Sequence, residues 1–302
     1  MGWMHPSPIS GYHQGMDYTI IDNGKDLLAK LDQWNGLERI AVDFEGEFNL
    51  HIYGEHLCLI QVYDGKGYYI IDPRANAMGK EELTAFFESD VKKVWFDCQS
   101  DNSLVFKKYG VGVRNICDVR IYAMALGHMS NLVSLEQLFL GLAPEVEAKS
   151  KKKLQQTNWL RRPLSREQIE YALSDVSNLF ALEDVLVEEV RKAGLEEQCA
   201  GEMARRTKPS VGKPAWTHLG PWRRMSAEQK ESVKQYYLAR EAVAKRFNVP
   251  SFHVIDKHML ADFALSCPRT EKEVHDFARK ASPRFQSQLD ECLMTAFRRL
   301  RG

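Results

Sequence analysis

The chain has 302 residues, of which 44% are hydrophobic, and its 41 Lys and Arg balance its 41 Asp and Glu. This length suits two domains, and no stretch approaches the roughly 20 apolar residues that cross a bilayer, which excludes a membrane-spanning protein. The first residues, 1–17, lack the cationic and apolar runs of a secretory signal, so we expect a cytoplasmic protein. The six cysteines are scattered, which argues against a zinc knuckle or a redox pair.

The charges are distributed unevenly along the chain. Residues 207–302 hold 18 Lys and Arg against 10 Asp and Glu, whereas the remainder holds 23 against 31. An acidic part can hold cations, and a basic part can hold a polyanion. The distribution therefore predicts a division of labour between the two parts.

The first part of the chain predicts a mixed sheet flanked by helices. Residues 1–19, rich in Gly, Pro, Ser and His, are expected to form a flexible tail. Short apolar, β-branched runs predict strands at Ile40–Phe44, Leu57–Tyr63, Tyr68–Ile71 and Lys93–Phe96. Helical periodicity is found at Glu81–Phe87, Ser103–Tyr109 and Val119–Leu126. This order of elements is typical of an α/β domain, which we place at residues 20–206.

Capping signals and a linker organise the rest of the chain. Ser165 and Gln168 form a capping box that predicts a long helix running to about Arg191. Residues 207–221 contain three prolines and two glycines and predict a linker. Further capping boxes begin at Ser226 and Thr270. We therefore expect a small all-α domain at residues 222–302.

Asp43 and Glu45 lie two residues apart at the end of the first predicted strand. Because side chains alternate along a strand, both carboxylates point to one face of the sheet. Two buried negative charges are costly unless a cation compensates them, and a divalent cation is the usual compensation. Taken alone, the pair more often marks a strand end that has reached solvent.

Three further residues carry candidate chemistry. Tyr171 and Asp175 are four apart on the long predicted helix and share one of its faces. Asp101 opens the helix that follows the fourth predicted strand. Taken singly, these could be a core tyrosine, a solvated aspartate and a helix N-terminal charge.

Together, the Asp-x-Glu pair, the middle Asp and the Tyr-x-x-x-Asp motif resemble the DEDD exonucleases in their tyrosine variant, as found in ribonuclease D. The segments Asn115–Asp118 and Trp159–Leu164 also resemble those of this family, and the similarity covers about residues 20–190. It implies a ribonuclease H-like fold. It also implies a metal-dependent 3′→5′ exoribonuclease that releases 5′-mononucleotides in RNA processing, such as tRNA 3′ maturation.

The resemblance also implies a role for each residue. Two divalent ions, Mg²⁺ or Mn²⁺, would be held by Asp43, Glu45, Asp101 and Asp175, with Asp43 bridging both and Asp101 anchoring one. Four carboxylates balance the charge of two such ions. Tyr171 would orient the attacking water.

Three residues near this set need a separate interpretation. The chain departs from the family at Phe96, where relatives often carry His, and this puts contacts near the substrate in doubt. Asp118 is expected to hold the sheet–helix junction. The role of Asp97 is left open.

Residues 226–301 resemble an HRDC domain, a helical module that follows the nuclease in ribonuclease D. Candidate phosphate contacts there are Arg223, Arg224, Lys245, Arg246, Arg279, Lys280, Arg284, Arg298, Arg299 and Arg301. The net excess of basic residues favours nucleic acid binding, although any single residue could be merely solvated. Lys149 and the run 151–153 form a second basic cluster, which is either a grip on the substrate or a solvated loop.

The expected partner is single-stranded RNA with a free 3′ end. A DNA exonuclease, a catalytically silent RNA-binding scaffold and a phosphatase acting on small molecules are the alternatives. The intact set of acids argues against the scaffold. The appended basic region argues against the phosphatase.

Overall fold

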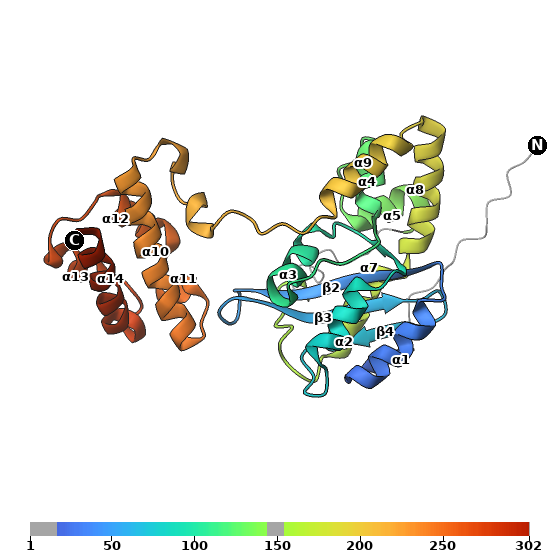
Figure 1. Ribbon diagram of the computed structural model, residues 1–302, viewed down its shortest axis with the longest axis horizontal. Coiled ribbons are helices and arrows are strands. Elements are labelled where there is room, and N and C mark those ends of the chain that lie inside the picture. Colours follow the sequence, from blue (N-terminus) through green and yellow to red (C-terminus); the bar gives the residue numbers. More distant parts are fainter. Residues whose placement is uncertain (1–16, 144–153, 302) are drawn as a thin grey trace, which may run out of the picture. The chain divides into compact units, whose positions relative to one another are not determined.

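The computed structural model describes residues 17–143 and 154–301. Contacts divide the chain into two compact units, one comprising Met1–Glu45 and Leu57–Ser210, the other Gly46–His56 and Val211–Gly302 (Figure 1). Among the described helices, none is both long and apolar enough to cross a membrane.

A six-stranded sheet forms the centre of the first unit. Its strands are β1 (Tyr18–Ile21), β2 (Arg39–Phe48), β3 (Glu55–Tyr63), β4 (Tyr68–Ile71), β5 (Lys92–Trp95) and β6 (Ile116–Asp118). Their order is β1-β4-β3-β2-β5-β6. β3 pairs antiparallel with β4, whereas β1 with β4, β2 with β5 and β5 with β6 are parallel. The mixed sheet expected from the sequence is confirmed, with β2 near its middle.

Helices cover both faces of this sheet (Figure 1). Val42 and Phe44 of β2 pack in one cluster with side chains of α1 (Gly24–Trp34), α2 (Lys80–Glu88) and α3 (Gln99–Tyr109). Ala41 packs on the other side with α4 (Val119–Ala125), α5 (Leu132–Leu140), α7 (Arg166–Ser177) and α8 (Leu179–Ala193). Because side chains alternate along a strand, Asp43 and Glu45 face away from the first cluster.

The prediction of one long helix from residue 166 to about Arg191 is wrong, because the structure has two helices there. α7 ends at Ser177, and α8 begins at Leu179. Asn178 between them has φ −111° and ψ 3°, outside the helical region. Tyr171 and Leu173 of α7 pack with β3 and β4, whereas the side chains of α8 pack in another cluster. The break lets each half bury its own apolar side.

The first unit ends with a segment fixed onto α3. After α9 (Glu196–Arg206), the carbonyl of Thr207 accepts a 2.5 Å hydrogen bond from the buried amide of Asn102. The backbone N–H of Ser210 donates to Ser103. A Cβ placed on Gly112 would lie 2.9 Å from the ring of Pro209, so glycine permits this close approach. Residues 207–210, which the sequence placed in the linker, therefore pack against the rest of the first unit.

The second unit is helical, apart from residues 46–56. Its elements are η1 (Ala215–His218), η2 (Trp222–Arg224), α10 (Ala227–Phe247), α11 (Ser251–Val254), α12 (Lys257–Leu265), α13 (Glu271–Ala278), η3 (Pro283–Phe285) and α14 (Gln286–Arg301). Both predicted capping boxes are present, at Ser226 and Thr270. Leu219 is buried in the apolar core of this unit, so packed structure begins within the stretch expected to be a linker.

We expect a chain truncated after Ser210 to be more stable than one truncated after Arg206. The shorter chain leaves the buried Asn102 amide without its acceptor, and an unsatisfied buried donor costs about 1–3 kcal/mol. Urea unfolding of the two chains measures the difference. A third chain ending at Pro214 serves as the control and should match the one ending at Ser210. Equal stability of all three would contradict a structural role for residues 207–210.

Candidate active site

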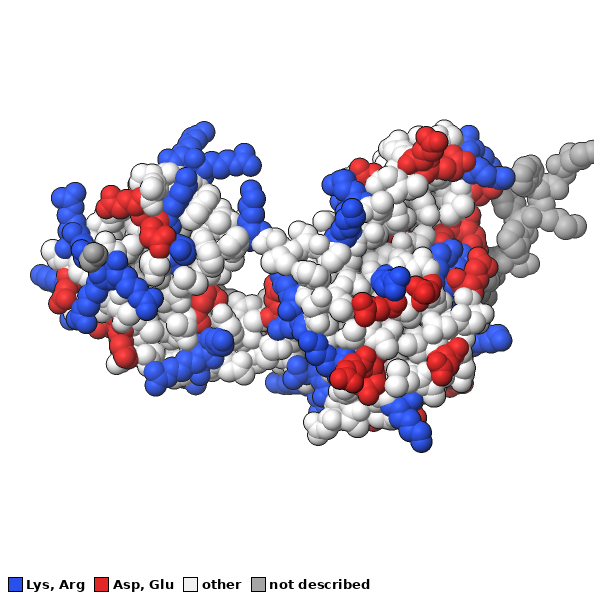
Figure 2. Space-filling model, viewed as in Figure 1, with Lys and Arg blue, Asp and Glu red and all other residues white. Residues whose placement is uncertain are grey.

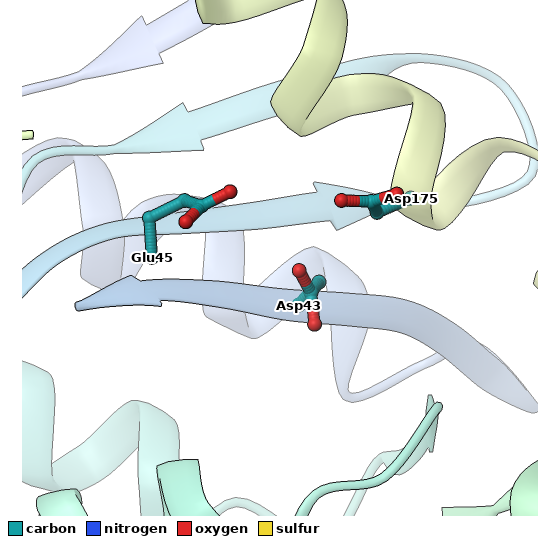
Figure 3. A group of neighbouring side chains, drawn as sticks. All are labelled: Asp43, Glu45 and Asp175. Carbon is teal, nitrogen blue, oxygen red and sulfur yellow. The ribbon is translucent and has the colours of Figure 1, made fainter. Parts of the chain in front are cut away.

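Three carboxylates meet above the middle of the sheet. Asp43 and Glu45 of β2 and Asp175 of α7 each offer an oxygen, and these atoms lie within 4.8 Å of one another. Figure 3 shows Asp175 reaching from its helix toward the two side chains of the strand. The structure thus brings together three of the four acids expected to bind metal, from parts of the chain about 130 residues apart.

The fourth acid, Asp101, lies in the first turn of α3. It is outside the group of three, but its charge raises the pKa of both Asp43 and Glu45, which places it nearby. Asp118 holds the turn that leads to it, since its carboxylate accepts N–H bonds of 2.8 Å from Asp97 and 3.1 Å from Cys98. The expected role of Asp118 at the sheet–helix junction agrees with this geometry.

The electrostatics of the group call for a cation. Burial raises the pKa of Asp43 well above its usual value, and the charges of Asp175 and Asp101 raise it further. Burial and neighbouring charges do the same to the pKa of Glu45. Burial, followed by Asp97 and Asp118, raises the pKa of Asp101 to about 8. Such acids ionise together only if positive charge enters, and clustered carboxylate oxygens are the ligands that Mg²⁺ and Mn²⁺ prefer.

Hydrogen bonds from Arg162 fix the segment that leads into α7, the helix that carries Asp175. Arg162 donates to Asp72 at 2.5 Å and to the carbonyls of Cys58 and Trp159 at 2.7 and 2.8 Å. The capping box of Ser165 then begins the helix. Arg162 therefore ties the segment before α7 to Cys58 within β3 and to Asp72, the residue that follows β4.

Tyr171 lies one turn before Asp175 and is 8% exposed. Its pKa is raised by burial first, then by the charges of Asp175 and Glu45. The phenol therefore stays protonated at neutral pH. The side chain of Gln155 hydrogen-bonds the same hydroxyl.

The residues left in doubt by the sequence form an ion pair and a ring contact. Arg120 pairs with Asp97, and its guanidinium lies 5.8 Å from the centre of the Phe96 ring. Asp97 thus has a cationic partner in α4. Phe96 itself packs at the edge of an apolar cluster.

Sequence reasoning missed three residues that support the site, namely Trp95, Gln155 and Arg162. The indole N–H of Trp95 donates to Asp43 at 3.2 Å. Trp95 and Arg162 lie within segments that the sequence singles out, Lys93–Phe96 and Trp159–Leu164, but motif spacing carries no information about which side chain donates to which acid.

A family model described as 3′-5′ exonuclease matches residues 18–191, which include every candidate site residue. The chain belongs to this family of 3′–5′ exonucleases. It is 31% identical to ribonuclease D of Sphingobium indicum over 243 residues, which are 78% of this chain and 61% of that protein. It is 29% identical to ribonuclease D of Zymomonas mobilis, covering 85% of this chain and 66% of the relative. The chain thus spans less than two thirds of the length of either relative.

Solved structures show the same fold. Escherichia coli RNase D, described as an exoribonuclease involved in structured RNA processing, matches with a TM-score of 0.71 and 22% identity over 93% of this chain and 75% of that one. The catalytic core of RRP6 from Trypanosoma brucei matches with a TM-score of 0.70 and 20% identity over 96% of this chain and 81% of that one. The expected ribonuclease H-like fold is confirmed, and a helical region follows the exonuclease domain.

We expect the metal-free protein to lose stability as the pH rises from about 4 to about 8. In the folded state the pKa of Asp101 is about 8, whereas an ordinary aspartate has a pKa of 3.8. The folded state therefore holds this proton over a pH range in which the unfolded chain has released it. Protons bound more tightly by the folded state stabilise it at low pH, and this contribution is lost as the pH rises through that window. Urea midpoints in EDTA across this range measure the slope.

Two comparisons make this test specific. Mn²⁺ should flatten the slope, because a bound cation favours the ionised acids. Asp101→Asn should make the slope shallower in EDTA, because the variant has no proton to lose at position 101, while Asp43 and Glu45 still contribute. A slope that is unchanged in both cases would contradict the electrostatic account.

Proposed function

We propose that this protein is a metal-dependent 3′→5′ exoribonuclease. The observation that carries the proposal is the half-buried group of Asp43, Glu45 and Asp175 in a chain of the 3′–5′ exonuclease family. Asp101 and Tyr171 complete a set that matches the chemistry of phosphodiester hydrolysis. The ribonuclease D relatives favour RNA as the substrate.

Two divalent ions held by these residues would activate the attacking water and neutralise charge on the leaving oxygen. The residues themselves perform three tasks. The charges of both Asp175 and Asp101 raise the pKa of Asp43, so Asp43 lies near both acids. This position suits a ligand shared between two ions. Glu45 and Asp175 would complete one binding position, and Asp101 would contribute to the other. The protonated hydroxyl of Tyr171 orients the attacking water, since its raised pKa makes it a poor base.

The helical unit supplies a separate surface for the RNA backbone. All ten of its candidate phosphate contacts, from Arg223 to Arg301, are exposed. Figure 2 shows more Lys and Arg than Asp and Glu on the drawn face of this unit. Arg284 lies over the rings of Phe247 and Phe285 at 5.6 and 5.3 Å, which holds its guanidinium at the surface. The second basic cluster, Lys149 and 151–153, lies outside the described residues.

A single assay tests the proposal. Single-stranded RNA labelled at its 5′ end should shorten progressively from the 3′ end in Mg²⁺ or Mn²⁺, releasing nucleoside 5′-monophosphates. EDTA should stop the reaction, and a circular RNA should remain intact. Faster shortening of the matched DNA would identify a DNA exonuclease instead. Binding of RNA without any cleavage would identify a silent scaffold.

We expect Asp43→Asn to reduce cleavage by a factor on the order of 10³ or more, because loss of a central catalytic group disables the whole constellation. RNA binding should change little, because the basic surface of the helical unit is untouched. Single-turnover cleavage and a filter-binding assay measure the two quantities. Asp90→Asn is the matched control, since the Asp90 side chain is 88% exposed and pairs with Arg114, outside the group of acids. Cleavage by Asp43→Asn within tenfold of the parent would refute the metal assignment.

We expect Tyr171→Phe to lower kcat by about 10²–10³-fold, the usual cost of losing one positioned hydrogen bond in a transition state. The ring stays, so packing of α7 against Trp159 should survive. Binding of Mn²⁺ and RNA should persist, because no carboxylate is removed. Tyr109→Phe, in a tyrosine packed on Phe87 of the same unit, is the control. Parental turnover by Tyr171→Phe would leave the hydroxyl without a catalytic role.

A further inference from the structure

Trp95 ends β5 and is fully buried beside the strand that carries the acids. Its strand pairs with β2, with Val94 opposite Ala41. The Trp95 ring is 0% exposed and lies edge-on to Phe44, with 4.3 Å between ring centres. Phe44 stands between Asp43 and Glu45 in the chain. Trp95 therefore packs against the backbone segment that places both carboxylates.

The polar end of this side chain is directed at the acidic group. An indole can only donate, and a buried tryptophan needs a partner for its N–H. Here the N–H of Trp95 donates to Oδ1 of Asp43 at 3.2 Å. The backbone N–H of Phe44 also donates to the Asp43 carboxylate. Two donors from rigid parts of the core fix the rotation of this carboxylate and leave its remaining lone pairs for a cation.

We propose that Trp95 is a positioning residue for the divalent cation, acting through the hydrogen bond from its indole N–H to Asp43. The inference rests on the proposed function, because it assumes that Asp43 is a metal ligand. Trp95 is too deeply buried to touch the substrate. Hydrogen-bond partners of metal ligands orient them, and their loss commonly weakens metal binding by about 10–100-fold.

The same core contains a matched control. Trp34 is also 0% exposed and belongs to the same apolar cluster. Its indole N–H likewise donates to a carboxylate, Oδ2 of Asp64, at 3.2 Å. Asp64 lies after β3 and pairs with Lys30, outside the acidic group. Removing either indole N–H therefore costs the core a comparable contact, but only Trp95 is bonded to the candidate metal group.

The test is calorimetric titration of the full chain with Mn²⁺, comparing the parent with Trp95→Phe and Trp34→Phe. We expect Trp95→Phe to weaken Mn²⁺ binding by about 10-fold or more and Trp34→Phe to leave it unchanged. The Mn²⁺ concentration for half-maximal RNA cleavage should shift by the same factor. At saturating Mn²⁺, the KM for RNA should equal that of the parent. A merely structural role would affect both variants alike.

The outcomes separate this inference from the proposed function. A parent that neither binds Mn²⁺ nor cleaves RNA refutes the proposed function. A parent that does both, with Trp95→Phe binding Mn²⁺ as well as Trp34→Phe does, refutes only the role of Trp95. Thermal melts in EDTA establish that each variant is folded. If Trp95→Phe does not fold, Trp95→Met and Trp34→Met replace the pair, since methionine fills irregular gaps in a core.

Discussion

Repulsion among carboxylates is the constraint around which the first unit is organised. Asp43, Glu45 and Asp175 hold oxygens within 4.8 Å of one another in a half-buried position, with Asp101 close enough to raise the pKa of Asp43. No fold gathers such charges for stability, because each raises the cost of ionising the next. The apolar packing on both faces of the sheet must offset this cost until a cation does so. The site is therefore a locally destabilised feature that the rest of the unit holds in place.

Three of the four acids are each positioned by a different kind of contact. Asp43 is fixed by the Trp95 indole, and the turn before Asp101 by the N–H bonds that Asp118 accepts. α7 is fixed at its entry by Arg162. Phosphodiester cleavage depends on positioning to within a fraction of an ångström, so these outer contacts matter as much as the ligands themselves. This explains why the acids come from a central strand and two helices rather than from loops.

The sequence predicted the central strands, the capping boxes and the acidic residues because these depend on local patterns. Alternation along one strand placed Asp43 and Glu45 together, and a helical turn placed Tyr171 beside Asp175. The break at Asn178 was missed, because the apolar spacing continues through it, although residues 169–173 of α7 pack in one cluster and the side chains of α8 in another. β1 was missed, and half of it was assigned to the tail, because three of its four residues are exposed and show no buried pattern. The bond from Trp95 to Asp43 depends on the lateral order of strands, which no spacing along the chain encodes.

The uneven charge of the chain follows from the same repulsion. Carboxylates that attract cations also repel phosphates, so the acidic group cannot recruit RNA before its charge is balanced. A surface elsewhere in the chain, with 18 basic residues against 10 acidic ones in residues 207–302, carries the charge that a polyanion requires without adding to the repulsion at the acidic group. The proposed function therefore requires RNA binding at the basic surface to depend on salt, and binding at the acidic group to depend on divalent ions. One chain can meet both electrostatic requirements, positive charge to bind a polyanion and negative charge to bind cations, because the two charges lie in different parts of its sequence.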